Sequence, residues 1–364
     1  MTRTLLREVR VYRDGAFGAP EDLVVDEGVI SSAPADGPAA VSGGYVVPGF
    51  IDCHVHLYGP ETLGALAAHG VTTGLDMSSP AELVAKLRGM PGVADIRSPL
   101  LAASSPASAH AARMKDIPAF DDALVAGAAD AEVWVDRHVE QGADFIKVVV
   151  DLPGFDQATV DALVGAAHAR GLKVVAHAAR SDAVAMAQRA GVDVLTHAPL
   201  DRPVDPGQAS ELVASGTVIV PTLTMMQGIV DNLAAKGVPG PVYEPARASV
   251  ATLHAAGMPI LAGTDANATP AAPASPVFGE SLHDELALLV DAGLTTVEAL
   301  DAATSVAAEH FGLADRGRIA PGLRADLVLL ADDPTVDIAA TRTVRGVWIA
   351  GERVVGEWNA HPAG

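Results

Sequence analysis

The sequence has only one cysteine, Cys53, in 364 residues. A single cysteine excludes a disulfide within the chain and is typical of proteins kept in a reducing compartment. Long hydrophobic runs are also missing. No apolar stretch is long enough to cross a bilayer, and the segment Met1–Glu8 lacks a run of signal-peptide length. These absences predict a soluble protein of the cytoplasm.

Basic residues are scarce relative to acidic ones. The 24 Lys and Arg residues stand against 45 Asp and Glu residues, which gives a formal net charge of −21 at pH 7. Such a chain repels phosphate backbones and anionic lipid headgroups, so we expect neither nucleic acid nor a membrane surface as its partner. The sequence leaves open whether the chain forms a homo-oligomer.

The two ends of the chain share one pattern. Residues 1–46 and 317–364 consist of short segments in which apolar and polar residues alternate, separated by turn signals such as Asp14-Gly15 and Glu27-Gly28. This pattern is typical of antiparallel strands. We expect the two ends to pair into one small composite β-sandwich domain.

The middle of the chain, residues 47–316, alternates strand-like and helix-like segments instead. Amphipathic stretches lie between most of the apolar ones, for example Asp156–Arg170 and Leu282–Ala292. Eight segments qualify as strands: Val46–Leu57, Val71–Met77, Ile96–Ser104, Phe145–Val150, Lys173–Ala178, Val194–Pro199, Val218–Leu223 and Pro259–Ala266. Eight such alternations predict an α/β fold, a (β/α)8 TIM barrel. A doubly wound open sheet is the alternative, but it needs a Gly-rich phosphate turn that the sequence lacks.

The first barrel strand carries a pair of histidines, His54 and His56. Side chains alternate faces along an extended strand, so both imidazoles point the same way. Four later strands also deliver a polar residue where a core strand should be apolar, namely Lys147, His177, His197 and Asp265. Barrel enzymes place their sites at the C-terminal ends of strands. The five strands together therefore predict a metal site.

These motifs resemble those of the amidohydrolase superfamily, in the branch of the imidazolonepropionase-like enzymes and Xaa-Pro dipeptidases. The resemblance covers nearly the whole chain. It rests on the segments Pro48–His56, Gly142–Lys147, Val175–Ala178, Ala262–Asp265 and Asp315–Leu327. The last of these leads, in the superfamily, from the barrel back into the small β domain.

The resemblance implies a site with two divalent metals. His54, His56 and Asp265 would bind one metal, His177 and His197 would bind the other, and Lys147, carboxylated by CO2, would bridge both. Nitrogen and oxygen ligands suit Zn²⁺, with Mn²⁺, Co²⁺ or Fe²⁺ as alternatives. Water activated by the two metals would then attack the substrate, and Asp265 would transfer its proton to the leaving group.

The resemblance also indicates the reaction class. Deaminases of the superfamily usually lack the bridging lysine and carry a glutamate three residues after the histidine of strand five, where this chain has Arg180. We therefore expect hydrolysis of a C–N bond in a small amide or peptide-like substrate, with His110 and Arg180 as candidate substrate contacts. A solvated loop position is the alternative for His110. Hydrolysis of an ester, lactone or carbamate is a second possibility for the same site, and a metal-free scaffold is the rival from another class.

Overall fold

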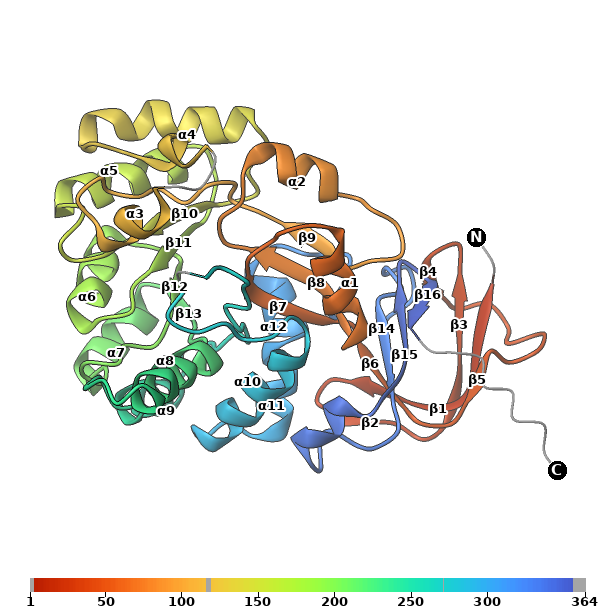
Figure 1. The fold of residues 1–364 in the computed structure, drawn as a ribbon. Coiled ribbons are helices and arrows are strands. Elements are labelled where there is room, and N and C mark those ends of the chain that lie inside the picture. The colour runs from red at the N-terminus through yellow and green to blue at the C-terminus, as the bar shows by residue number, and fades with distance from the viewer. Residues whose placement is uncertain (1–2, 116–118, 271, 356–364) are drawn as a thin grey trace.

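The computed structural model describes residues 3–115, 119–270 and 272–355. It shows strands and helices alternating through the middle of the chain, beside a separate sheet (Figure 1). The strands of the middle part are β7 (Phe50–Val55), β8 (Val71–Asp76), β9 (Asp95–Arg97), β10 (Ile146–Val149), β11 (Val174–His177), β12 (Val194–Thr196) and β13 (Val218–Val220). No helix within these ranges is both long and apolar enough to span a membrane.

Helices follow most of these strands and cover the outside of the strand ring (Figure 1). They are α1 (Pro60–Ala68), α2 (Ala81–Leu87), α3 (Ala109–Met114), α4 (Ala131–Glu140), α5 (Gln157–His168), α6 (Ser181–Ala190), α7 (Pro206–Ala214), α8 (Leu223–Ala235), α9 (Glu244–Ala255), α10 (Glu280–Asp291), α11 (Thr296–Ala302) and α12 (Ser305–His310). The helix α5 shows how the sequence sets these bounds. Asp156 accepts a hydrogen bond from the backbone N–H of Thr159 at 2.9 Å and so caps the first turn.

Parallel pairing joins the strands into a ring. The strands β7, β8 and β9 form one parallel sheet, and β10 to β13 form another. Three isolated parallel bridges connect the sheets: Ala103 with Val148, Ile219 with Ile260, and Val55 with Ala266. The extended segment 260–266 thus takes the eighth place, between β13 and β7. The predicted α/β barrel class is confirmed.

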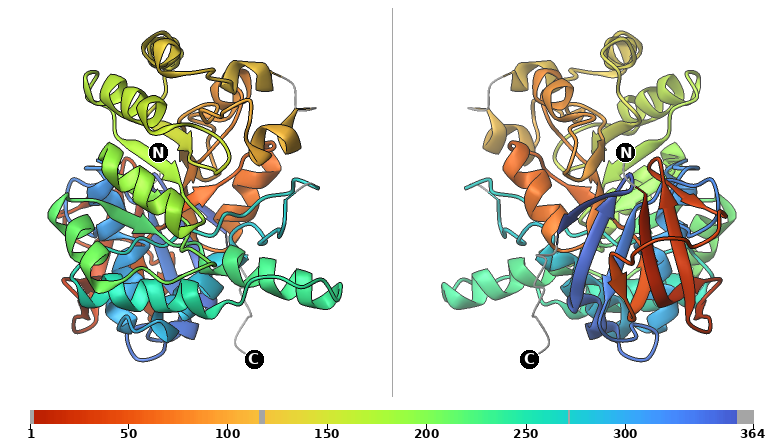
Figure 2. Two further views of the ribbon diagram at one scale, coloured as in Figure 1. Left: turned by 90° about the vertical axis from the view of Figure 1, so that its left-hand side faces the viewer. Right: turned by 90° about the vertical axis from the view of Figure 1, so that its right-hand side faces the viewer.

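A second sheet contains strands from both ends of the chain, and we call it the end sheet. The view from its side shows the N-terminal strands and the C-terminal strands lying next to one another (Figure 2). Its main order is β16-β15-β14-β6-β1-β3-β4, with β2 and β5 pairing with β1. The bounds are β1 (Thr4–Arg13), β2 (Ala16–Phe17), β3 (Glu21–Asp26), β4 (Val29–Ser31), β5 (Val41–Ser42), β6 (Tyr45–Pro48), β14 (Leu327–Leu330), β15 (Val344–Ile349) and β16 (Glu352–Val355).

The predicted single strand over Val46–Leu57 is wrong. The chain divides at Gly49 into β6, which belongs to the end sheet, and β7, which belongs to the barrel. A side chain at Gly49 would place its Cβ 2.2 Å from Thr72 Oγ1, and the Gly49 N–H donates to the Asp326 carbonyl at 2.8 Å. Only glycine fits where the chain passes from one sheet to the other.

Two other predicted strands are shorter than expected. Regular pairing over Ile96–Ser104 is limited to β9, which ends at Arg97, and the segment Pro259–Ala266 pairs only through isolated bridges. Pro259 lacks an N–H for a ladder, and Asp265 has a left-handed backbone with φ of 59°. The Ala-rich stretch around residues 101–131 contains α3 and the two 3-10 turns η1 (Phe120–Ala123) and η2 (Ala128–Asp130).

A buried ion-pair cluster fastens the segment before β14 to the bottom of the barrel. The Arg316 side chain is only 3% exposed, and its Nη1 lies 2.8 Å from Asp95 Oδ2 at the start of β9. Arg324 pairs with the same carboxylate at 3.0 Å and with Asp326 at 3.0 Å. Burial alone would raise the pKa of Asp95, but the charge and hydrogen bond of Arg316, together with the charges of Arg97 and Arg324, outweigh it and lower that pKa to about 2.

Candidate metal centre

The ends of three successive strands of the ring share an unusual backbone conformation. His197 follows β12, Thr222 lies just after β13, and Asp265 lies in the eighth segment, with φ values of 76°, 48° and 59°. Left-handed backbone is uncommon outside glycine and costs about 1–3 kcal/mol for other residues. Such residues concentrate at functional sites, where the surrounding structure holds them. The rim at these three strands is therefore the first place to look for a site.

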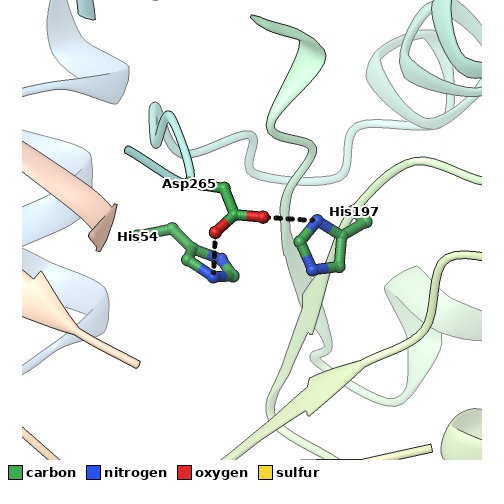
Figure 3. Close-up of side chains that lie close together, drawn as sticks. All are labelled: His54, His197 and Asp265. Atoms are coloured by element: carbon green, nitrogen blue, oxygen red, sulfur yellow. Dashed lines mark ion pairs between the residues drawn. The ribbon is translucent and has the colours of Figure 1, made fainter. Parts of the chain in front are cut away.

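Three candidate ligands meet at this rim. Donor atoms of His54, His197 and Asp265 all lie within 4.8 Å of one another, and all three residues are buried. The Asp265 carboxylate lies between the two imidazole rings (Figure 3), with Oδ1 3.4 Å from His54 Nε2 and Oδ2 4.0 Å from His197 Nδ1. A carboxylate placed between two neutral imidazoles is a donor set that suits a divalent cation.

His56 reaches the same carboxylate from the end of β7. Its Nε2 lies 3.0 Å from Asp265 Oδ1, and its ring centroid lies 5.6 Å from that of His54. Burial would lower the pKa of His56, but the hydrogen bond and charge of Asp265 outweigh it and raise that pKa. The two histidines of the first barrel strand thus flank one oxygen atom, as the alternation of side chains along a strand requires.

His177 approaches from the end of β11. Its ring centroid lies 4.4 Å from that of His197, and the His197 centroid lies 5.0 Å from that of His54. The Nε2 atom of His177 points to Asp151, whose Oδ1 lies 3.6 Å away. The histidines of β7, β11 and β12 therefore form one continuous group.

Lys147 lies in β10 with only 3% of its surface exposed. Its Nζ donates to Thr196 Oγ1 at 2.7 Å. Burial lowers the pKa of the Lys147 ammonium to about 7, although the charges of Asp265 and Asp76 act in the opposite direction. The Lys147 ammonium is thus a far stronger acid than that of an exposed lysine.

The buried histidines stay neutral. Burial, followed by the charge of Lys147, lowers the pKa of His54 well below its usual range. Burial and the neighbouring His177 do the same for His197. The His54 Nδ1 atom is buried without a hydrogen-bond partner among the described residues. Neutral imidazoles with available lone pairs are what metal ligation requires.

The buried side chain of Asp52 holds the backbone next to Asp265. Asp52 in β7 accepts hydrogen bonds from the Thr264 N–H at 3.0 Å and the Thr264 hydroxyl at 2.7 Å, and from the His54 N–H at 3.1 Å. Burial raises the pKa of Asp52 to about 7 despite these bonds. Asp52 therefore fixes the backbone beside two candidate ligands, one on each of two adjoining segments of the ring.

The two candidate substrate contacts have different surroundings. His110 in α3 is held by Ser104 Oγ at 2.9 Å from its Nδ1, and burial lowers the pKa of His110 to about 3, with His177 also acting on it. The side chain of Arg180 is 56% exposed and pairs with Asp182 at 3.2 Å. The structure therefore fixes the His110 ring against Ser104 and leaves the Arg180 guanidinium at the surface.

Three residues that the sequence reasoning missed also lie at this rim. They are Asp76, Asp151 and Thr222. Asp76 at the end of β8 is fully buried and accepts hydrogen bonds from Ser79 Oγ at 2.8 Å and Ser98 Oγ at 2.5 Å. Each of the three follows or ends an apolar strand, and this position is the sequence signal that could have revealed them.

Comparison with known proteins identifies the family. The sequence model of the amidohydrolase family matches residues 45–354. An uncharacterized protein of Mycobacterium tuberculosis is 28% identical over 370 residues, covering 90% of this chain and 91% of that protein. The imidazolonepropionase of Deinococcus deserti is 33% identical over 227 residues, covering 61% of this chain and 51% of that protein.

The fold is shared with a solved structure. A Xaa-Pro dipeptidase with bound methionine in its active site superposes with a TM-score of 0.82 at 21% identity, covering 97% of this chain and 99% of that one. The family match spans most of the sequence, from the last strand of the N-terminal part of the end sheet through the whole barrel to β16. This chain therefore belongs to the amidohydrolase family.

Proposed function

We propose that the protein is a metal-dependent amidohydrolase that hydrolyses an amide or peptide-like C–N bond of a small molecule. The observation that carries the proposal is the cluster of His54, His197 and Asp265 at the rim, with His56 and His177 beside it and Lys147 on the adjoining strand β10. These six, which we call the ligand set, are His54, His56, Lys147, His177, His197 and Asp265. The named relatives include an imidazolonepropionase and a dipeptidase, and both support a C–N bond as the target.

The ligand set fits a binuclear metal centre. His54, His56 and Asp265 would hold one divalent ion, and His177 and His197 would hold a second. The fit rests on the buried, neutral state of His54 and His197 and on the buried His54 Nδ1 that lacks a partner among the described residues. Imidazole and carboxylate donors favour Zn²⁺, and Mn²⁺, Co²⁺ and Fe²⁺ accept the same donors.

Lys147 would complete the centre as a carboxylated lysine. Its pKa of about 7 leaves a large share of the amine unprotonated at neutral pH. The Nζ lone pair can then attack the carbon of CO2, so that an N–C bond forms, the electron pair of one C=O π bond moves to its oxygen, and the nitrogen releases a proton to water. The product is a carbamate anion, which replaces a buried cation by an oxygen donor. Burying that anion is favourable only when cations face it.

Asp265 would act as the proton carrier of the reaction. Bound divalent metals would supply polarisation of the substrate carbonyl and a lower pKa for water. The Asp265 carboxylate, placed between His54 and His197, would accept a proton from the attacking water and pass it to the leaving nitrogen. Asp52 and Thr264 would keep the carboxylate in position through their hydrogen bonds.

Metal analysis of the purified protein tests the proposal. We expect about two divalent ions per chain, loss of hydrolysis after chelation, and recovery when Zn²⁺ or Mn²⁺ is returned. Activity would be followed on a panel of amides, dipeptides, esters, lactones and carbamates. The panel separates the C–N hydrolase from an ester, lactone or carbamate hydrolase. Full activity with almost no metal would refute the proposal, and absence of both metal and activity would favour the scaffold.

A further inference from the structure

Of the three residues with left-handed backbone at the strand ends, His197 and Asp265 belong to the ligand set and Thr222 does not. It lies just after β13, between His197 and Asp265 in the order of the ring, and it is completely buried. A threonine is branched at Cβ, so a φ of 48° is a real strain for it. Such a residue persists only where its surroundings compensate for the strain.

The side chain of Thr222 holds His197. Its Oγ1 lies 2.7 Å from His197 Nδ1, and both atoms are buried. When Nδ1 carries the proton and donates it to this hydroxyl, the lone pair of the ring is on Nε2. A partner of this kind fixes both the tautomer and the orientation of a metal-binding histidine.

The backbone around Thr222 is braced by Glu285 from α10. Its Oε1 accepts the N–H of Leu223 at 2.9 Å, and its Oε2 accepts the N–H of Thr224 at 2.8 Å. These are the first free N–H groups of α8, where Thr222 makes no side-chain cap of its own. Glu285 is completely buried, so it replaces the missing cap from another helix.

The same brace reaches the segment of Asp265. The Thr224 hydroxyl lies 3.0 Å from Glu285 Oε2 and 3.2 Å from the carbonyl oxygen of Thr264, the residue before Asp265. Glu285 thus ties together the ends of two neighbouring segments of the ring, one carrying Thr222 and the other carrying a member of the ligand set. A displacement at Glu285 would therefore be passed to His197 and Asp265 together.

We propose that Thr222, braced by Glu285, is a positioning residue that presents His197 Nε2 to a divalent cation. The inference rests on the proposed metal centre, and its subject is the hydroxyl of Thr222. Loss of an outer partner of a metal-binding histidine commonly weakens metal affinity about 10–100-fold. Loss of a buried threonine with no such role lowers stability and leaves the affinity of the folded protein unchanged.

Four variants separate these two roles. Thr222→Val removes the hydroxyl and keeps the shape, and Thr222→Ser keeps the hydroxyl. Thr222→Gly removes the hydroxyl where the left-handed backbone suits glycine. Thr217→Val is the matched control, since Thr217 is also buried and lies at the opposite end of β13, where its hydroxyl donates to the Val192 carbonyl at 3.0 Å.

The readouts are Zn²⁺ affinity, measured by competition with a chromogenic chelator, and the ¹⁵N chemical shifts of His197 in the metal-free protein. We expect Thr222→Val and Thr222→Gly to bind Zn²⁺ about 10–100-fold more weakly, with a mixed His197 tautomer. Thr222→Ser and Thr217→Val should match the parent protein in both.

Wild-type affinity in either hydroxyl-free variant overturns the inference; if Thr222→Val fails to fold, Thr222→Gly decides. Failure of the parent protein to bind Zn²⁺ would instead refute the metal centre.

Discussion

Lys147 shows how far a barrel strand can change the chemistry of one residue. An exposed lysine keeps its proton near neutral pH, whereas burial in β10 lowers the pKa of Lys147 to about 7. Among the described residues, the Lys147 Nζ donates to the neutral hydroxyl of Thr196. A buried ammonium without a full counter-charge is unfavourable, so the surroundings favour a chemical change at Nζ.

Lys147→Ala should therefore weaken metal binding. The alanine removes the group that we propose as the bridge and leaves a space in β10, so short carboxylic acids added to the buffer should restore part of the metal content. Elemental analysis with and without added acetate or propionate measures both effects. Equal metal content in the variant and the parent would show that Lys147 is not a bridge.

Asp265→Asn should lower kcat and keep most of the metal. The amide retains one oxygen donor of similar size, but it cannot accept a proton, and removal of a general acid–base group reduces the rate about 10²–10⁴-fold. Steady-state kinetics with parallel metal analysis measures the two quantities. His69→Ala is the control, because His69 ends α1 just before β8 begins, at the opposite end of the barrel from the strand ends that carry the ligand set. Near-parental kcat with both metals present would limit Asp265 to a ligand.

Among single residues, the sequence revealed the candidate ligands that stand out in a local pattern of neighbouring residues. The alternation of a strand placed His54 and His56 on one face, and a lysine among Phe, Ile and Val marked Lys147. The sequence did not reveal Thr222 or Asp151. Each acts through a contact with a histidine on another strand, and no spacing along the chain encodes such a contact.

Among the elements, the passage between the two sheets depends on the segment that precedes β14. Arg316 and Arg324 both pair with Asp95 at the start of β9, and Arg324 also pairs with Asp326, one residue before β14. Breaking a buried ion pair by removing one partner commonly costs about 3–5 kcal/mol, because the other charge stays buried. The cluster therefore stabilises the folded protein, and protonation of its carboxylates in acid should remove this contribution.

The stability of the protein should fall in acid in part through Asp95. The pKa of Asp95 is about 2 in the folded protein, whereas an unperturbed aspartate, as in the unfolded chain, has a pKa of 3.8. The unfolded chain therefore takes up the proton first as the pH falls. The contribution, about 2 kcal/mol by this difference, is present above pH 4 and is lost as the pH falls towards 2. Urea denaturation between pH 5 and pH 3 should show a smaller loss with falling pH in Asp95→Asn than in the parent. An unchanged pH slope would contradict this assignment.

The bounds of the helices were readable from the sequence because caps are local. The predicted helical stretch Asp156–Arg170 contains α5, which Asp156 caps, and α10 overlaps the predicted Leu282–Ala292. The division at Gly49 was not readable, since an unbroken apolar run looks the same whether one sheet or two receive it. What divides the run is Thr72, a contact between distant residues that leaves no space for a side chain.

In the whole molecule, the end sheet depends on both ends of the chain. The strand β14 lies between β15 and β6, and β6 in turn pairs with β1. Trp348 in β15 is fully buried in a core that also contains Leu6, Val9 and Val46. We propose that the chain divides into a composite domain, predicted at residues 1–46 and 317–364, and a barrel, predicted at residues 47–316; β6 extends the first part of the composite domain to Pro48.

Deletion of residues 330–364 should give insoluble protein. It removes β15 and β16 entirely, exposes the edge of β14, and takes Trp348 from the core of the end sheet. An open, apolar sheet edge promotes association between chains. Solubility after centrifugation and size-exclusion chromatography measure the effect. The control ends at Val355 and keeps every strand of the sheet; a soluble, active deletion of 330–364 would disprove the dependence.

The pairing of Pro48 with Leu327 also bears on how the chain is synthesised. At about 5–20 residues per second, a ribosome needs on the order of 15–60 s to add the stretch between these partners. Throughout that time the strands β1 to β6 have emerged without the neighbour that covers β6. The first part of the chain to emerge is therefore among the last to reach its final structure, and the nascent chain offers chaperones a long interval in which to bind it.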